Sequence, residues 1–388
     1  MMRRLKRAAL LGLSGVMLTA APLTAMAGSP EFARSAEEWA KLRDNVIEYD
    51  EIAGLIHEYN ATVQKDSIDY AEFRREYGET NDEVATKYRE LADDLLSVDY
   101  PDIDDSNYGM VMAQIIGNEQ SAKQYQQTAD DALEDSYVKY MTNCQTEANL
   151  VASAQTEMIN YYLNQLQLEI AQKSKEMQQD SYQSALNRRG AGMATDVDVL
   201  TALESVHNAD QTIQNTQTAI DTGRQKLQVM LGWKADDAPE IREIPAVDME
   251  QIASMNPEAD RDTALANSYT QLINLRKLEN ARSEDKKETL QTSVAETERS
   301  IYATLSASYQ SVLAAKTSYD LAVAQYSLEQ QNQQVADRKV ATGEMSQLEY
   351  RTQSNTTEVS RLKVDVAELN LFQTIQTYQW KVNGLAGA

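Results

Sequence analysis

The sequence contains an internal repeat with a constant offset of 151 residues. At this offset Gly192 aligns with Gly343, and no gap is needed over roughly fifty positions. The other matched positions are Leu150 with Ile301, Ala154 with Leu305, Met158 with Tyr309, Tyr161 with Val312, Gln165 with Lys316, and Leu168 with Tyr319. Because a repeat encodes one structural unit twice, the chain is expected to fold as two equivalent halves.

Both halves lack the residues that interrupt helices. No proline occurs in residues 102–238 or 258–388, and a proline inside a helix removes a hydrogen bond and clashes with the preceding turn. Prolines fall instead in the stretch 238–257. We therefore predict an all-α protein with two helical repeats, residues 28–237 and 258–388, joined by a linker at 238–257.

Apolar positions in the second half recur at alternating steps of three and four residues from Ile301 to Tyr326. This spacing predicts helices that pack lengthwise, as in coiled coils. The chain has 20 Tyr but only 3 Phe, so one side of this helix wall is expected to face water. If the helix from Asn107 to Arg189 is continuous, it spans on the order of 120 Å at about 1.5 Å per residue. Such a rod needs neighbours along its length, which favours oligomerisation.

Each half closes on a turn with the pattern Gly-x-x-[Ser/Thr]-x-x-[Asp/Glu]. Its residues are Gly192, Thr195 and Asp198 in the first half and Gly343, Ser346 and Glu349 in the second. The glycines are expected to take the positive φ that ends a helix. The hydroxyl residues are predicted N-caps of the returning helices, and the acids complete capping boxes. Two long helical hairpins follow, with returning helices that end near Gly232 and Gly384.

The first 27 residues have the pattern of a secretory signal peptide. Four basic residues precede an apolar stretch from Ala8 to Ala21, and Ala25-Met26-Ala27 forms a small-x-small cleavage site. An uncleaved membrane anchor is the alternative, although this stretch is shorter than the ~20 residues that a bilayer requires. Removing residues 1–27 changes the formal net charge from −24 to −28. Such an acidic, exported protein offers no basic surface for nucleic acid.

The N-terminal part of the first repeat, residues 66–105, is acidic, with fourteen acids and four bases. Two helices are predicted here, joined by a turn at Tyr100-Pro101-Asp102. The aspartates around this turn are Asp99, Asp102, Asp104 and Asp105. They could bind calcium, but their spacing lacks the glycine and the terminal glutamate of a calcium loop. The pattern favours a solvated acidic turn.

No residue pattern indicates catalysis, a metal site or a cofactor. His57 and His207 are the only histidines, and the chain has no glycine-rich phosphate loop. The single thiol, Cys144, cannot form an intrachain disulfide or a metal cluster and is predicted to be a small apolar filler. We therefore predict a protein that is not an enzyme and has no catalytic, metal or cofactor site.

The turn at residues 192–200, its repeat at 343–349 and the segment Asp248-x4-Ala253-x2-Asn256-Pro257 resemble the TolC family of efflux outer-membrane factors. The resemblance covers residues 140–388 and, more weakly, 35–65. It implies a homotrimer in which each chain contributes two helical hairpins to a closed helical tunnel, an α-barrel outside the cytoplasmic membrane. Exported substrates would pass through the middle of this tunnel.

The resemblance also implies that the hairpin tips dock on a periplasmic adaptor, which couples the tunnel to an inner-membrane pump such as an ABC-type pump. The matching tip residues are Ala191, Gly192 and Met193 in the first hairpin and Thr342, Gly343 and Glu344 in the second. Glu344 stands where the family has an apolar residue, so the second tip departs from the docking signature.

Family members also narrow the tunnel entrance with acidic side chains, and Asp198 and Glu349 occupy the matching turn. In a trimer they could form an acidic ring that favours cations. Alternatively, they serve only as helix caps together with Thr195 and Ser346.

One departure from the family concerns the membrane. Members in an outer membrane insert pairs of amphipathic strands, which would fall near Tyr100 to Asn107 and near Arg282 to Lys287. Neither stretch has the alternating apolar pattern of such strands. We therefore expect a tunnel without a membrane β-barrel, in an envelope that lacks an outer membrane or as a conduit that stops short of one.

The alternative to a conduit is a non-conducting structural or adhesive coiled-coil protein of the cell envelope. Such a protein would share the heptads, the acidity and the export signal. It gives no reason for a hairpin turn that recurs with the same glycine, cap and acid.

Overall fold

The computed structural model describes residues 29, 33–98, 100–101, 108–234 and 236–387. The predicted signal peptide at 1–27 and the aspartates Asp99, Asp102, Asp104 and Asp105 lie outside the described residues. The α-helices are α1 (Ala36–Leu42), α2 (Ile52–Tyr59), α3 (Ala61–Tyr77), α4 (Asn81–Leu96), α5 (Tyr108–Asp130), α6 (Ser136–Gly190), α7 (Asp196–Met230), α8 (Met249–Ser254), α9 (Pro257–Asn267), α10 (Tyr269–Asn280), α11 (Glu284–Ala341) and α12 (Gln347–Trp380). The short elements are β1 (Val46–Ile47), η2 (Tyr49–Glu51), β2 (Glu240–Ile241) and the π-helix η3 (Lys381–Leu385).

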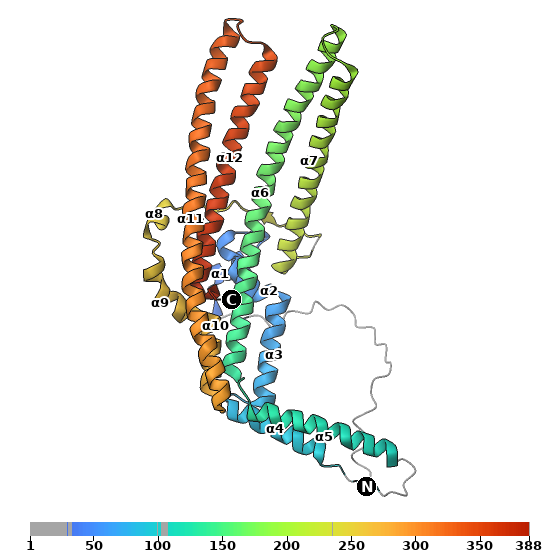
Figure 1. Ribbon diagram of the computed structural model, residues 1–388, viewed down its shortest axis with the longest axis vertical. Helices are drawn as coiled ribbons and strands as arrows, with labels where there is room; N and C mark the ends of the chain where they lie inside the picture. Colours follow the sequence, from blue (N-terminus) through green and yellow to red (C-terminus); the bar gives the residue numbers. More distant parts are fainter. Residues whose placement is uncertain (1–28, 30–32, 99, 102–107, 235, 388) are drawn as a thin grey trace.

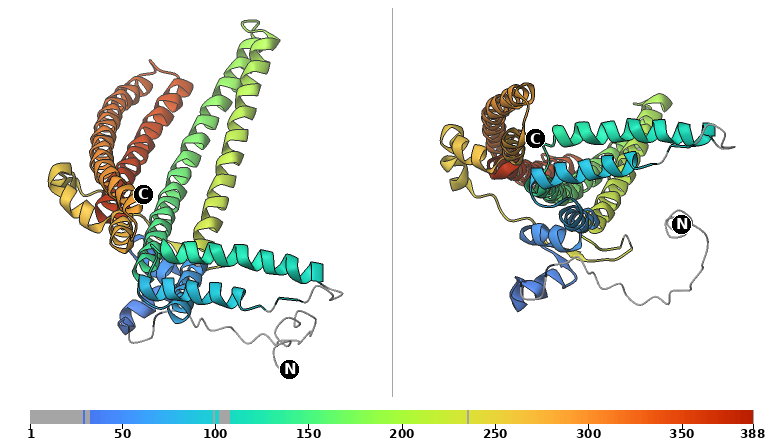
Figure 2. Two further views of the ribbon diagram at one scale, coloured as in Figure 1. Left: turned by 60° about the horizontal axis from the view of Figure 1, so that its bottom comes forward. Right: turned by 90° about the horizontal axis from the view of Figure 1, so that it is seen from below.

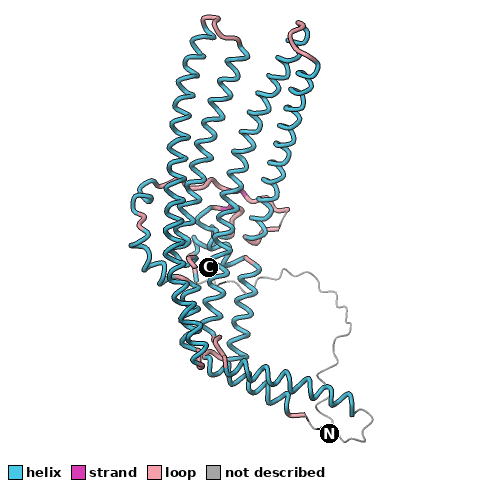
Figure 3. Tube along the Cα trace, viewed as in Figure 1, coloured by secondary structure: helices cyan, strands magenta, loops and turns pink. Residues whose placement is uncertain are grey.

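Two long antiparallel hairpins dominate the fold (Figure 1, Figure 3). Hairpin 1 consists of α6 and α7, and hairpin 2 consists of α11 and α12. The bounds of the hairpins match the sequence repeat. The last residues of α6 and α11 are 151 residues apart, and so are the first residues of α7 and α12. This confirms the predicted all-α class with two hairpins. Across the described residues, no helix combines the length and apolar content needed to cross a bilayer.

The four long helices lie side by side in the order α7, α6, α12, α11, with both turns at the same end (Figure 1). Towards the other end α3 takes the place of α7 and α10 that of α12, so the order becomes α3, α6, α10, α11. The molecule is thus an open layer of four helices, with α7 and α3 at one edge and α11 at the other, where α8 and α9 lie against the outside of α11 (Figure 1).

The two places where one helix replaces another are built alike. At the first, the Asn60 side chain caps α3 and donates a hydrogen bond of 2.8 Å to the carbonyl of Met230. At the second, Ser268 caps α10 and donates one of 2.9 Å to the carbonyl of Ala386. A positive-φ glycine lies at each join, Gly232 and Gly384. Both returning helices therefore end close to the predicted glycines.

Each half has its own hydrophobic core. The first packs Ile52, Leu55 and Ile56 of α2 against Met158 of α6 and Leu227 of α7. The second packs α8 and α9 onto the lower part of hairpin 2, through residues that include Ile252, Ala264, Ile301, Leu305, Leu371 and Ile375. Phe372 of α12 belongs to the first core, where its ring meets that of Tyr49 edge-on at 5.1 Å. The halves are therefore joined through apolar contact as well as through the linker.

The linker between the halves is partly ordered by pairing. Its strand β2 runs parallel to β1, with Val46 opposite Glu240 and Ile47 opposite Ile241. Tyr162 of α6 donates a hydrogen bond of 2.8 Å to the carbonyl of Ile241. These contacts hold the linker against the base of hairpin 1.

The stretch from Asn107 to Arg189 does not form one continuous helix, so the length of 120 Å does not apply, because the chain leaves helical geometry at residues 131–135. Asp135 adopts an extended conformation, with φ −144°, and its side chain caps α6 by accepting from the backbone N–H of Val138 at 2.9 Å. The 55 residues of α6 therefore span on the order of 80 Å. The preceding helix, α5, turns aside and packs on α4. We call the α4–α5 pair the arm; it lies across the long axis of the molecule (Figure 2).

Candidate functional site: the two hairpin tips

Tip 1, residues 190–200, reverses the chain between α6 and α7. The backbone N–H of Gly192 donates to the carbonyl of Arg189 at 2.9 Å, and that of Met193 donates to the carbonyl of Arg188 at 2.8 Å. This pair of bonds is the Schellman arrangement that satisfies the last carbonyls of a helix. It requires φ of +73° at Gly192, a conformation that residues with a Cβ rarely adopt.

Tip 2, residues 341–351, repeats this geometry. The N–H of Gly343 donates to the carbonyl of Val340 at 3.2 Å, and that of Glu344 donates to the carbonyl of Lys339 at 2.8 Å. Gly343 has φ of +77°. A Cβ added to either tip glycine would meet nothing within 4 Å, so the glycines serve backbone conformation and leave the tips bare.

A capping box starts each returning helix. In tip 1 the N–H of Asp198 donates to the hydroxyl of Thr195 at 3.2 Å, and the N–H of Thr195 donates to Oδ2 of Asp198 at 2.7 Å. The corresponding distances between Glu349 and Ser346 are 3.2 and 2.9 Å. Bonds from the backbone N–H and hydroxyl of Thr195 lower the pKa of Asp198, and those from Ser346 lower the pKa of Glu349. Both carboxyl groups are therefore ionised at neutral pH.

The surfaces of the two tips differ despite this common backbone. Met193, Val197 and Leu200 of tip 1 are exposed at 66%, 70% and 63% of their surfaces. At the repeat offset their counterparts in tip 2 are Glu344, Leu348 and Arg351. Tip 1 thus presents an apolar patch, whereas tip 2 presents a mixed polar one. Val197 and Leu200 were not among the predicted site residues, although apolar residues in the first turns of a solvent-exposed helix are a signal that sequence alone can provide.

The structure places the ten predicted tip and cap residues on two separate turns at one end of the molecule (Figure 1). Below the turns the hairpins are linked, because Arg351 of α12 forms an ion pair with Asp180 of α6. The arrangement provides two bare turns held by backbone hydrogen bonds and, beside each turn, one charged carboxylate.

Solved structures with a similar fold are known. The chain is similar to a membrane protein from Pseudomonas aeruginosa, with a TM-score of 0.53 and 12% identity over 84% of this chain and 93% of that one. It is also similar to the outer-membrane channel OprN, with a TM-score of 0.52 and 12% identity over 94% of this chain and 98% of that one.

No family model and no curated protein matches the sequence. At 12% identity the structural likeness is a likeness of fold. It confirms the resemblance at that level: the chain has the fold of the TolC-family outer-membrane channels.

Proposed function

We propose that this protein is the exit duct of a tripartite-type efflux or secretion system. Three copies would close a helical tunnel that conducts substrates delivered by an inner-membrane pump through an adaptor. The observation that carries the proposal is the open layer of four helices with both hairpin turns at one end. A layer with two free edges can close head to tail into a ring that encloses a lumen.

The edges of the layer have surfaces suited to such closure. Edge helix α11 exposes Leu321, Leu328 and Val335, at 69%, 49% and 40% of their surfaces. Edge helix α7 exposes Val229 at 56%. A single exposed apolar residue is unremarkable, but a row of them along one long helix supports contact with another chain. In a ring, α7 of one copy would lie beside α11 of the next.

The tips fit the role of docking sites. The turns at Ala191, Gly192, Met193 and at Thr342, Gly343, Glu344 are bare and held by backbone hydrogen bonds. An adaptor would bind there, with tip 1 providing most of the apolar contact. The pump could be of the ABC type. A protein that works with such an adaptor and pump would be exported and would act in the cell envelope.

The carboxylate of Asp198 lies beside the turn of tip 1 and that of Glu349 beside the turn of tip 2, so three copies would bring six carboxylates to one end of the tunnel. They cap their helices and remain charged, hence capping does not prevent them from forming a ring that favours cations.

Negative-stain images of the purified protein test the proposal. An open ring in end views supports a conduit. Closed rods without a lumen would instead support a structural or adhesive protein of the envelope.

A further inference from the structure

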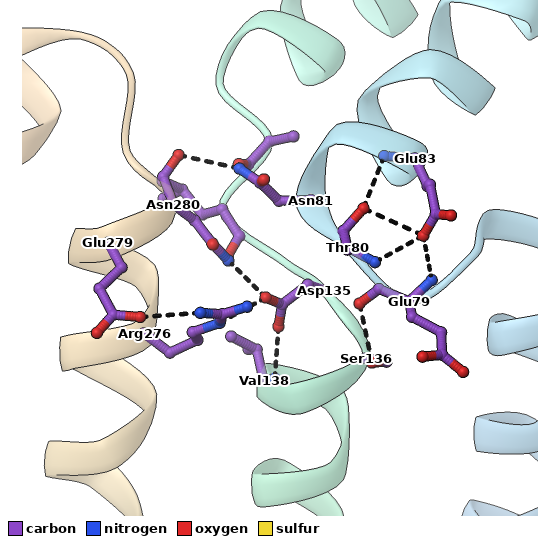
Figure 4. Close-up of polar contacts among 12 residues, drawn as sticks. Glu79, Thr80, Asn81, Glu83, Asp135, Ser136, Val138, Arg276, Glu279 and Asn280 are labelled. Carbon is purple, nitrogen blue, oxygen red and sulfur yellow. Dashed lines mark hydrogen bonds and ion pairs between the residues drawn. The ribbon is translucent and has the colours of Figure 1, made fainter.

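The arm is fixed to the base of the molecule by an ion pair between the buried Asp135 and the half-buried Arg276 (Figure 4). The side chain of Asp135, at the root of the arm, is fully buried. Its Oδ2 accepts from Nε of Arg276 at 2.6 Å and from Nδ2 of Asn280 at 3.1 Å. Its Oδ1 accepts from the N–H of Val138. Buried carboxylates persist where they are bonded this fully, and such bonds fix geometry. The root of the arm therefore has one orientation relative to α10.

A second set of hydrogen bonds joins the two chain segments at the root of the arm. Nδ2 of Asn81 donates to the carbonyl of Asn280 at 3.1 Å. The N–H and hydroxyl of Ser136 donate to the carbonyl of Glu79 at 3.1 and 2.9 Å. The start of α4 and the start of α6 are thus tied to each other and to the end of α10 (Figure 4).

Aromatic packing stiffens the proximal half of the arm. Four aromatic rings contact one another in sequence from α3 through α4 to α5, with successive centroids 5.3, 5.4 and 6.0 Å apart: Phe73, Tyr77, Tyr88 and Tyr125. The seam between α4 and α5 contains the buried alanines Ala85, Ala92, Ala122 and Ala129. The arm is thus a rigid projection, and a rigid element loses little conformational freedom when it binds.

The distal half of the arm exposes apolar side chains. Met110 and Ile116 of α5 are exposed at 72% and 59% of their surfaces, and Leu96 of α4 at 47%. Residues 108–118 contain no charged side chain, although 25% of the whole chain is charged. An apolar surface at the end of a rigid projection marks a contact site.

The direction of the arm points to its partner. In every view it extends away from α11 and past the edge formed by α3 and α7 (Figure 1, Figure 2). In the proposed ring, that edge meets the α11 edge of the next copy. We infer that the arm reaches the next copy of this chain and packs its apolar end against the foot of that copy's α11, residues 284–295, below the part that α9 covers. This inference rests on the proposed ring.

The charges near the end of the arm argue against an anionic lipid surface as the occupant. Residues 90–122 contain eight acids and no lysine or arginine. Helices that lie on anionic membranes carry basic residues on their polar face. A protein surface is consistent with this composition.

A photo-crosslinking amino acid at position 110 tests the placement. Isotopically light and heavy chains are mixed and allowed to assemble. The assemblies are then irradiated, and the crosslinked peptides are identified by mass spectrometry. We expect light-heavy crosslinks from position 110 to residues 284–295. Crosslinks that stay within one chain, or that join position 110 only to the arm of another copy, would overturn the inference.

The double variant Met110→Gln, Ile116→Gln tests the contribution to assembly. We expect the concentration for half-assembly to rise at least tenfold by native mass spectrometry, because two apolar contacts are lost. The matched control is Leu275→Gln on α10, an inner helix of the layer with an exposed apolar side chain (39%), which should change that concentration less than twofold. Circular dichroism melts show whether each variant keeps its fold.

The outcomes separate the two proposals. If the wild type forms rings and the double variant assembles equally well, the arm has no such role and the ring stands. If the wild type remains monomeric at high concentration, the ring itself is wrong. Flotation of the wild type with phosphatidylcholine vesicles that is lost in the double variant would assign the apolar end to lipid and contradict the inference.

Discussion

At tip 1 and tip 2 the same backbone turn carries different chemistry. Both glycines have φ near +75° and both acids close a capping box. However, tip 1 exposes Met193, Val197 and Leu200, where tip 2 has Glu344, Leu348 and Arg351. The backbone is fixed by local hydrogen bonds, whereas the surface side chains are free to diverge. The comparison indicates that the hairpin shape is required twice and that apolar contact is concentrated at one tip.

The largest expected effect comes from the apolar patch of tip 1. We predict that Val197→Asp with Leu200→Asp weakens capture of an adaptor from the same organism more than a hundredfold, because burying each side chain is worth about 1.5–3 kcal/mol. Leu348→Asp in tip 2 should weaken capture less than tenfold. Surface plasmon resonance gives the dissociation constant of the adaptor for both variants. Equal losses of affinity at the two tips would contradict the claim that apolar contact is concentrated at tip 1.

The tip glycines test the shared backbone. Gly192→Val and Gly343→Val should each destabilise their turn by about 1–2 kcal/mol, since a β-branched residue is strained at positive φ. Hydrogen exchange of the tip amides should accelerate about equally in both variants. A large difference between them would show that the two turns are not equivalent in solution.

A slightly smaller effect is expected from the caps. Thr195→Ala and Ser346→Ala should each cost about 1 kcal/mol of local stability, as is usual for the loss of an N-cap hydroxyl. Exchange protection of the first turns of α7 and α12 measures this cost. Unchanged exchange protection of the first helical turn in either variant would mean that the capping box of that helix does not form in solution.

The pH dependence of the boxes follows from the same bonds. Because the folded pKa of Asp198 and Glu349 is lowered, their contribution is present above the unfolded values of about 3.9 and 4.3. It is lost as the pH falls through the lower folded pKa values. Carbon NMR of the two carboxyl groups should therefore give midpoints below the unfolded values, and midpoints at or above them would contradict the hydrogen bonds described.

The smallest effect concerns ion selectivity. We predict that Glu349→Gln and Asp198→Asn each reduce the preference for cations in bilayer recordings by about twofold, since each removes three charges from a ring of six. Unchanged selectivity in both variants would leave these residues with a capping role alone.

The parts of the fold that were predictable from sequence are those fixed by neighbours in the chain. The hydrogen bonds of the turn at Gly192 involve only residues 188–198, and the turn at Gly343 repeats them. The offset of 151 residues in the sequence is therefore enough to predict where both hairpins reverse. The ends of α7 and α12 are predictable for the same reason, because a glycine with positive φ follows each of them, two residues after Met230 and four after Trp380.

The parts that were missed depend on distant partners. The break before α6 requires Arg276 and Asn280, which lie 141 and 145 residues beyond Asp135. Without them the stretch 131–135 has no proline and looks compatible with a helix. The arm was missed in consequence, because its direction is set at that break. The exposure of Val197 and Leu200 also depends on how the helices pack in three dimensions, which a helical period alone does not reveal.

The central claim is that the four-helix layer closes through its own edges around a lumen, and a cryo-EM reconstruction of the purified protein tests it most directly. We predict a threefold ring in which α7 of each copy lies beside α11 of the next, with all six hairpin turns at one end. A reconstruction in which the edges pack against each other without a central opening, or in which neighbouring copies run in opposite directions, would contradict the account.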